Sequence, residues 1–141
     1  MSIYADSSIF VSLYLRDAHF ANAKARVLTG GPLWLSPLHW VEWNHAIAQH
    51  VFRRFISERE AAAVCRAFEA DRQTGAWLSV EMPEKAFETA VDLARKHVPQ
   101  LGCRTLDTLH VASALELGAD EFWSFDARQL KLASAAGLKS S

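Results

Sequence analysis

The sequence predicts an α/β fold with a short, mostly parallel sheet. Short apolar segments alternate along the chain with longer segments that have the 3.6-residue periodicity of helices. Helices placed between strands supply the crossovers of a parallel sheet and cover both of its faces. The length of 141 residues, with 50% hydrophobic and 22% charged residues, is typical of one compact domain, which we expect to span residues 1–141.

The first half of the chain is predicted to open with a strand that ends at Asp6, and the serines after it can cap a helix. Asp17 can cap the next helix, and Ser36 followed by a proline marks the start of a third. A capping box at Ser57 introduces a fourth. The expected elements are strands over 2–5 and 33–35 and helices after Asp6, over 18–28, after Ser36 and over 57–72.

The second half continues the alternation of strands and helices. Apolar and polar residues alternate from Trp77 to Glu81 as in a strand, and Pro83 suits the first turn of a helix that ends near His97. Gly118 and Gly137 are predicted to stop two later helices. The expected elements are strands over 77–81 and 121–125 and helices over 83–97, 105–117 and 126–136.

Composition and motifs exclude several classes of protein. Fifteen Lys and Arg against sixteen Asp and Glu give a net charge of −1, without the basic field of a general nucleic-acid coat. No GxGxxG, GxxxxGK(S/T), GxSxG or HExxH sequence occurs, which removes motif support for nucleotide-binding, serine-hydrolase and zinc-protease sites. Cys65 and Cys103 lack zinc-site spacing and are expected to be free buried thiols in a reducing compartment. With no signal sequence or membrane span, we expect a cytoplasmic protein.

Four carboxylates occupy unusual positions in the chain. Asp6 is the first Asp, Glu, Lys or Arg, and Glu42 and Asp107 each stand alone in an apolar segment. Asp126 follows a predicted strand, as Asp6 does, and the carboxyl ends of parallel strands lie at one edge of a sheet. A carboxylate in apolar surroundings is unfavourable unless a proton, a cation or a polar partner offsets its charge. Oxygen donors suit Mg²⁺ or Mn²⁺ better than Zn²⁺, so we expect the four acids to share such an ion.

Each of these acids also has a purely structural interpretation. Asp6 and Asp126 can act as helix N-caps. Glu42 can hydrogen-bond to a histidine on its own helix, and Asp107 lies in a first helical turn, where the helix dipole stabilises negative charge. All four interpretations would have to hold together for the shared site to be absent, which favours the site.

Four segments of the chain together resemble the acidic motifs of PIN domains, specifically those of the VapC-type toxins of bacterial toxin–antitoxin pairs. Each segment alone is a weak signal, but the order and spacing agree over the whole chain. The segments are residues 3–8, 40–42, 104–112 and 123–126, with the sequences IYADSS, WVE, RTLDTLHVA and WSFD. This resemblance implies a PIN-like three-layer α/β/α sandwich with a short, mostly parallel central sheet.

The resemblance also implies a function, a Mg²⁺-dependent endoribonuclease that hydrolyses RNA phosphodiester bonds and accepts Mn²⁺ as a substitute. Asp6, Glu42, Asp107 and Asp126 are then the catalytic acids and the metal ligands, with Asp6 and Asp107 binding the ion directly. VapC-type toxins form homodimers and are neutralised by a VapB-type antitoxin in heterotetramers or larger assemblies. The implied partners are therefore RNA and a cognate antitoxin, with no membrane.

Other residues near the acids have candidate roles. Ser7 and Ser124 are candidates to orient the acids, although Ser7 can also cap a helix. Arg104 and Arg128 are candidates to hold RNA phosphates, although exposed arginines are often only solvated. His110 lies on the same helix as the third acid, either beside the site or packed in the core.

An aromatic cluster surrounds the second acid. Trp40, Trp43, Phe52 and Phe55 flank Glu42, and core packing is the first explanation for them. The segment is too aromatic to be wholly internal in a small domain. We therefore expect part of it to form a dimer surface or a groove for an antitoxin.

The chain lacks the motifs of two other classes of protein that use an aspartate at the end of a strand. Haloacid-dehalogenase-like phosphatases require a second Asp two residues after the first, where this chain has Ser8. Receiver domains require an acidic pair before the phosphorylated Asp and a late Lys, and this pattern is also absent. The alternative that stays open is a PIN-like module that binds RNA or protein without catalytic activity.

Overall fold

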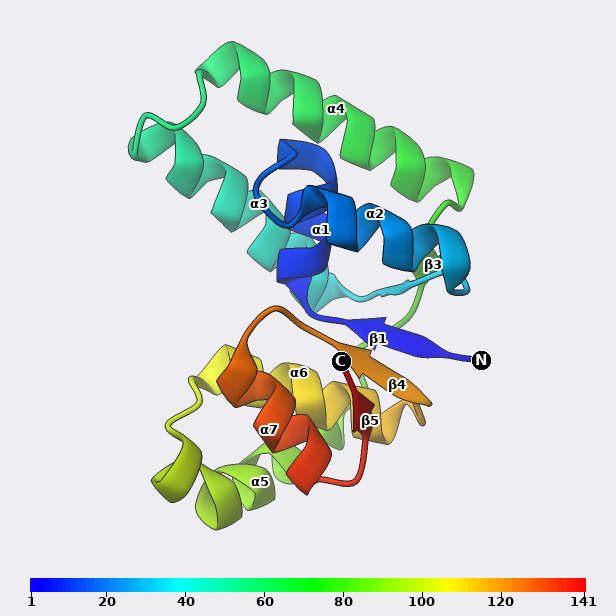
Figure 1. Cartoon of the computed structure of the whole chain (residues 1–141), viewed down its shortest axis with the longest axis vertical. Helices are drawn as coiled ribbons and strands as arrows, with labels where there is room; N and C mark the ends of the chain where they lie inside the picture. Colours follow the sequence, from blue (N-terminus) through cyan, green and yellow to red (C-terminus); the bar gives the residue numbers. More distant parts are fainter. The chain divides into compact units, whose positions relative to one another are not determined.

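The computed structural model describes residues 1–141, which form two compact units (Figure 1). Residues 1–6 and 82–141 make up the first unit, and residues 7–81 make up the second. Each unit contains its own small sheet, and the strand pairs in both sheets are parallel. The predicted α/β class with a short parallel sheet is therefore confirmed, whereas a single domain over residues 1–141 stays a prediction.

The first unit combines a three-stranded sheet with three helices. The strand order is β1–β4–β5, and α7 connects β4 to β5 (Figure 1). The elements of this unit are β1 (Ile3–Ala5), α5 (Ala86–Leu101), α6 (Thr105–Glu116), β4 (Glu121–Trp123), α7 (Ala127–Ala135) and β5 (Lys139–Ser140). Residues from both ends of the sequence thus build one sheet.

Strand β1 is buried on both of its faces, as its continuous apolar sequence predicts. Tyr4 has no exposed surface and stacks on Phe122 of β4, with the ring centroids 5.8 Å apart. Ala5 lies opposite Trp123 in the β1–β4 register, and the Asp6 amide donates to the Trp123 carbonyl at 2.8 Å. The pairing of β1 with β4 therefore fixes where the backbone of Asp6 lies in this unit.

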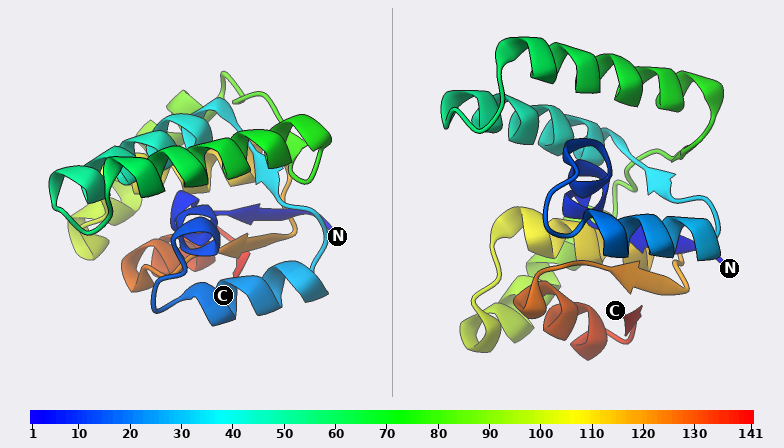
Figure 2. Two further views of the ribbon diagram at one scale, coloured as in Figure 1. Left: turned by 90° about the horizontal axis from the view of Figure 1, so that it is seen from above. Right: turned by 45° about the horizontal axis from the view of Figure 1, so that its top comes forward.

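The second unit is mainly helical and carries a two-stranded parallel sheet. Its elements are α1 (Ser7–Leu15), α2 (Phe20–Thr29), β2 (Trp34–Leu35), α3 (Pro37–Phe52), α4 (Glu58–Thr74) and β3 (Leu78–Ser79). Ser36 and Ser57 cap α3 and α4 by accepting hydrogen bonds from the amides three residues later, as the sequence predicts. The helices α3 and α4 lie side by side as a hairpin in both views of Figure 2.

Phe68 of α4 is the centre of the aromatic core of the second unit. Its buried ring stacks on Trp43 and Trp40, with ring centroids 4.1 Å and 5.5 Å away. Phe10 and Tyr14 of α1 contact the same ring at steep interplanar angles. Such stacked and edge-on pairs stabilise a core beyond the burial of their area. The tryptophans of the predicted aromatic cluster are therefore packing residues.

Helix α5 differs from its prediction at both ends. It begins three residues after Pro83 and continues through Pro99, whereas we expected an end near His97. Pro99 is tolerated because it lies in the last turn, where the loss of one backbone hydrogen bond costs little. Gly102, in the left-handed conformation, closes that turn.

Several other boundaries also differ from the predictions. Helix α2 begins at Phe20, because the Asp17 carboxylate accepts from the Ser12 hydroxyl at 3.0 Å and from the His19 amide at 2.9 Å without capping the first turn. Strands β3 and β4 cover only residues 78–79 and 121–123. Strand β5 was not predicted, because its two polar residues have no apolar pattern and backbone pairing with β4 holds them.

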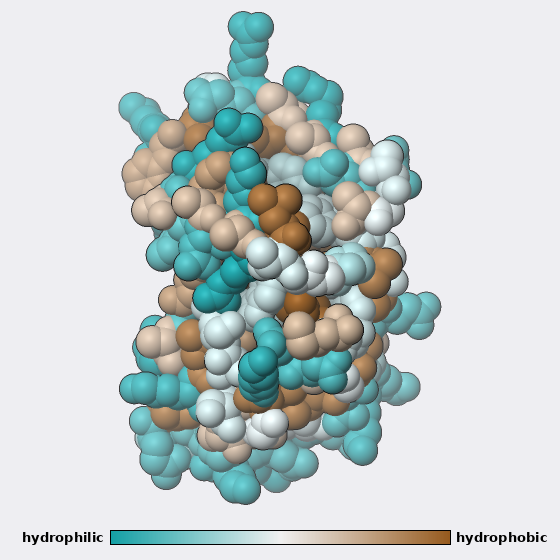
Figure 3. Space-filling model, turned by 45° about the vertical axis from the view of Figure 1, so that its right-hand side comes forward, coloured by the Kyte–Doolittle hydropathy of each residue, from teal (hydrophilic) through white to brown (hydrophobic).

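The surface of the chain is mixed in character. None of the helices combines the length and the apolar content that crossing a bilayer requires. Hydrophobic residues reach the surface in small areas, brown among teal on the face drawn in Figure 3. Phe52, at 86%, is the most exposed large hydrophobic residue. Both cysteines are free thiols, with Cys65 half-buried and Cys103 buried.

Tyr14 joins α1 to two other parts of the second unit. Its hydroxyl donates to the Asp71 carboxylate of α4 and accepts from the Trp77 indole nitrogen at 3.0 Å. Burial, followed by the hydrogen bond to Asp71, raises the pKa of Tyr14 far above its usual range. The hydroxyl is therefore protonated at neutral pH, as its hydrogen bond to Asp71 requires.

We expect Tyr14→Phe to lower the free energy of unfolding by about 1–3 kcal/mol, because Asp71 and Trp77 each lose a partner in a largely buried position. Urea denaturation measures the effect. Thr29→Ala is the control, since the Thr29 hydroxyl bonds only to carbonyls of its own helix, and we expect it to change stability by less than about 0.5 kcal/mol. An unchanged unfolding midpoint for Tyr14→Phe would contradict the prediction.

Candidate functional site

The carboxyl ends of β1 and β4 lie at one edge of the sheet in the first unit. Asp6 directly follows β1, and its backbone extends the ladder to Trp123. Asp126 lies three residues after the end of β4 and begins α7. The parallel pairing therefore brings both predicted strand-end acids to the same edge, as the sequence predicts.

A fully buried glutamine connects the segments that carry these acids. The Gln129 amide nitrogen contacts Asp6 Oδ1 at 3.4 Å and the Asp107 carbonyl at 3.2 Å, and its oxygen accepts from the Ser124 hydroxyl at 2.6 Å. Ser124 in turn accepts from the Asp126 amide at 2.9 Å. One side-chain amide thus ties β1, α6 and the β4–α7 connection together.

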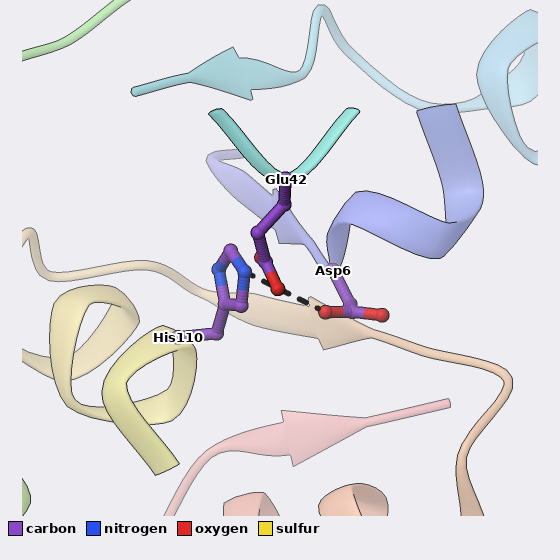
Figure 4. Close-up of side chains that lie close together, drawn as sticks. All are labelled: Asp6, Glu42 and His110. Atoms are coloured by element: carbon purple, nitrogen blue, oxygen red, sulfur yellow. Dashed lines mark ion pairs between the residues drawn. The ribbon is translucent and has the colours of Figure 1, made fainter. Parts of the chain in front are cut away.

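His110 of α6 approaches Asp6 from another direction. Its Nε2 lies 3.7 Å from Asp6 Oδ1 (Figure 4). Its Nδ1 hydrogen-bonds to the Tyr4 hydroxyl at 2.7 Å. The imidazole is fully buried, and its ring stands edge-on to the Tyr4 ring. His110 therefore both packs in the core and lies beside Asp6, so that the two interpretations of this residue are compatible.

Asp107 and Arg104 form an ion pair in the first turn of α6. Arg104 Nε lies 3.3 Å from Asp107 Oδ2, and the Arg104 side chain is 76% exposed. The hydrogen bond to Asp107 and its negative charge raise the pKa of Arg104, and the charges of Asp126 and Asp6 act in the same direction. Three of the predicted acids thus act on a single guanidinium group.

Asp126 caps α7, as its structural interpretation predicts. Its Oδ1 accepts from the amides of Arg128 and Gln129 at 2.8 Å and 3.2 Å, and Arg128 Nε lies 4.0 Å from the same oxygen. The negative charge of Asp126 also acts on Cys103, whose thiol has a raised pKa because of burial, followed by the charges of Asp107 and Asp126. The cap engages one of the two carboxylate oxygens, so a role as a cap is compatible with a role as a ligand.

Glu42 and Ser7 belong to the second unit. The Ser7 hydroxyl donates to Glu42 Oε1 at 2.9 Å, which links α1 to α3. His39, one of the histidines on the helix of Glu42, pairs its Nδ1 with the Ser36 hydroxyl at 2.8 Å. Ser7 is also the residue that follows Asp6 in the chain, so Glu42 is bound to the neighbour of the first acid.

The donors in the first unit fit a hard divalent cation. The side chains of Asp6, Asp107 and Asp126 are 12%, 17% and 30% exposed, so they are neither fully buried nor freely solvated. Their oxygen atoms are the ligands that Mg²⁺ and Mn²⁺ prefer, and Mn²⁺ also accepts an imidazole nitrogen. The three acids of the first unit therefore offer the oxygen donors that such an ion requires.

Gln129 and Tyr4 contact the site residues although neither was predicted from the sequence to do so. The spacing of Asp126 and Gln129 matches a capping box, in which Gln129 would accept from the Asp126 amide. In the structure Ser124 accepts from that amide instead, and the Gln129 side chain hydrogen-bonds to Asp6. The pattern could have singled out Gln129, but not its partners, which come from distant segments.

The fold and the site define a class of protein, an α/β protein with carboxylates gathered at the carboxyl ends of short parallel strands. The model of the PIN domain family matches residues 3–135 of the chain. The chain therefore belongs to the PIN domain family. No curated protein sequence matches it.

Solved structures with a similar fold include three bacterial proteins. VapC20 of Mycobacterium tuberculosis, described as a toxin that cleaves the sarcin–ricin loop, is 22% identical, with a TM-score of 0.70 over 97% of this chain and 96% of that chain. FitAcB of Neisseria gonorrhoeae is 14% identical, with a TM-score of 0.71 over 98% and 95%. VapBC2 of Rickettsia felis, bound to a DNA fragment from its promoter, is 13% identical, with a TM-score of 0.68 over 100% and 98%. At these identities the likeness shows the fold.

We expect Gln129→Leu to lower the free energy of unfolding by about 2–3 kcal/mol, because the Ser124 hydroxyl and the Asp107 carbonyl lose their buried partner. Chemical denaturation measures this change. Gln100→Leu is the matched control, since Gln100 is exposed at the end of α5, and its effect should stay below about 0.5 kcal/mol. Equal destabilisation by the two variants would show that the amide does not tie the segments together.

Proposed function

We propose that the chain is a divalent-cation-dependent endoribonuclease and the toxin of a VapBC-type toxin–antitoxin pair. The observation that carries this proposal is geometric: in a PIN domain, the buried Gln129 amide contacts Asp6 and the Asp107 carbonyl at the sheet edge where Asp126 caps α7, and Arg104 lies beside Asp107. Like charges gathered in one region need a cation to offset them, and one exposed arginine offsets them only in part. The fold shared with VapC20 adds support, since that protein is described as a toxin that cleaves the sarcin–ricin loop.

Asp6, Glu42, Asp107 and Asp126 are the proposed catalytic acids and cation ligands, with Mg²⁺ as the ion and Mn²⁺ as a substitute. A bound cation supplies positive charge against the phosphodiester oxygens and lowers the pKa of water. The chain itself holds the carboxylates in place. Ser7 fixes one oxygen of Glu42, and Gln129 does the same for Asp6.

Arg104 and Arg128 are the proposed contacts for RNA phosphates near the acids. Their side chains are 76% and 57% exposed, so both guanidinium groups are open to a ligand. Each also lies beside a proposed cation ligand, at 3.3 Å from Asp107 and 4.0 Å from Asp126. A phosphate held there would face the acids and any cation that they bind.

The proposed partners follow from the same class of protein. A VapB-type antitoxin would neutralise the nuclease in a heterotetramer or larger assembly built on a homodimer. VapBC2 and a toxin–antitoxin complex from Klebsiella pneumoniae share the fold. The RNA substrate and such an antitoxin would both be met in the cytoplasm, which is the proposed location of the protein. Residues 1–141 are proposed to act there as one domain.

A non-catalytic PIN-like module that binds RNA or protein is the second candidate. The observation that favours it is the capping of α7 by Asp126, which gives that acid a structural role without any ion. The two candidates differ in whether RNA is cut.

We expect Asp6→Asn and Asp107→Asn each to lower the rate of RNA cleavage at least about 100-fold, because each removes a charge that the cation needs. Cleavage of total RNA with Mg²⁺, with mapped ends, measures the rate, and EDTA should abolish it. Asp92→Asn on the exposed face of α5 is the control with the same loss of charge. Cleavage that persists in both site variants would contradict the nuclease mechanism. RNA binding without any cleavage by the wild type would favour the non-catalytic module.

We expect Arg104→Gln to have opposite effects on the two proposed ligands. Without the ion pair, Asp107 is free to bind a cation, so Mg²⁺ or Mn²⁺ affinity should rise about 2- to 5-fold. RNA affinity should fall, because a phosphate contact is lost. Calorimetry without RNA and fluorescence anisotropy with RNA measure the two affinities. Arg95→Gln on α5 controls for net charge, and parallel changes in both affinities would contradict the assignment.

A further inference from the structure

The turn between α3 and α4 has an unusual backbone. Helix α3 ends in a pair of hydrogen bonds, from the Phe55 amide to the His50 carbonyl at 2.9 Å and from the Arg54 amide to the Val51 carbonyl at 3.0 Å. This pair defines a Schellman motif, in which the residue at the position of Arg54 must be left-handed. Arg54 has φ of 60°, in the conformation that glycine adopts most readily.

Arg54 therefore occupies a position where glycine would be more stable. Arg16, at the end of α1, is the other left-handed residue that is not glycine, with φ of 52°. Its guanidinium lies 5.4 Å from the centre of the Phe20 ring, so its side chain has a contact within the fold. Arg54 is exposed and pairs with no carboxylate. A side chain kept at a strained position, without a role in packing, indicates a role in binding.

The residues around Arg54 share two chemical properties. Phe52 and Phe55 are 86% and 68% exposed, although burial is the usual state of a phenylalanine ring. Residues 50–60 contain three arginines and two glutamates, a local charge of +1 in a chain whose net charge is −1. A depression of about 430 Å³ opens beside the turn, and its lining includes Arg54, Phe55 and the two glutamates, Glu58 and Glu60.

Single-stranded RNA is the ligand that these properties fit. Unpaired bases stack on exposed aromatic rings, and arginines bind phosphates through parallel hydrogen bonds. The ring of His50 stands edge-on to Phe55 at 5.7 Å and holds that ring in place. Phe52 and Phe55 flank two adjacent arginines, so two exposed rings and two guanidinium groups lie within four consecutive residues.

We propose that the α3–α4 turn, residues 52–59, is an RNA-docking surface that holds a single-stranded part of the substrate. This inference rests on the proposed ribonuclease function, because a docking surface serves a nuclease by holding the strand to be cut. The surface uses neither the four acids nor Arg104 and Arg128. It divides the predicted aromatic cluster, since Trp43 packs in the core while Phe52 and Phe55 face the solvent.

The test measures RNA binding separately from cleavage. The full chain, in EDTA, is titrated against a fluorescein-labelled single-stranded RNA of about 12 nucleotides, and anisotropy gives the affinity. Three variants are compared with the wild type: Phe52→Ala with Phe55→Ala, Arg54→Gly, and Arg16→Gly. The last is the matched control, because it removes the same charge and relieves the same backbone conformation away from the turn.

We expect the double phenylalanine variant to bind at least about 10-fold more weakly, since base stacking on each ring is lost. Arg54→Gly should bind about 3- to 10-fold more weakly and lower the slope of log affinity against log salt by about 0.7, while unfolding at the same or a higher urea concentration. Arg16→Gly should unfold similarly and bind RNA like the wild type.

Two results would overturn the inference. Equal RNA affinities for the turn variants and the wild type would do so, and so would an equal loss in Arg16→Gly. A change in sedimentation without a change in RNA affinity would identify the turn as a protein interface instead. If the wild type cuts RNA with Mg²⁺ but the turn variants bind normally, only the docking surface fails. If the turn variants lose binding and the wild type never cuts RNA, only the nuclease proposal fails.

Discussion

The structure of the first unit depends on how negative charge is held at the end of a buried sheet. Asp6 follows a strand without exposed residues, and Asp107 and Asp126 belong to the helices around it. Carboxylates in such positions are tolerated only when polar groups surround them. Gln129 supplies such a group at the centre, and Arg104 supplies a positive charge at the rim. The same arrangement that makes the acids tolerable also makes them available to a cation.

Much of the fold could be predicted from local sequence signals. The apolar run before Asp6 identified β1, and serines at positions 36 and 57 identified the starts of α3 and α4. These signals are reliable because a cap or a buried strand depends on a few neighbouring residues. The parallel sheet followed from the order of elements alone. The lengths of β3 and β4 could not, because a strand ends where its partner ends.

The candidate site was only partly accessible to the same reasoning. Isolated acids could be recognised because charge is rare in apolar segments. The contacts of Gln129 and His110 could not, since each depends on side chains more than one hundred residues away in the sequence. Strand β5 could not be predicted either, because backbone pairing with β4 and not an apolar pattern holds its polar residues. The aromatic cluster around α3 was divided between core and surface by tertiary packing, which no periodicity shows.

The pairing of β1 with β4 has a consequence for the order of events during synthesis. Ile3 lies opposite Glu121, so β1 must wait for the synthesis of more than one hundred further residues before it finds its partner. At about 5–20 residues per second, that delay is roughly 6–25 s, during which Tyr4 and its neighbours have no sheet to join. Closing so long a loop is also a slow step in folding. Asp6, which directly follows β1, thus reaches its final surroundings long after it has been synthesised.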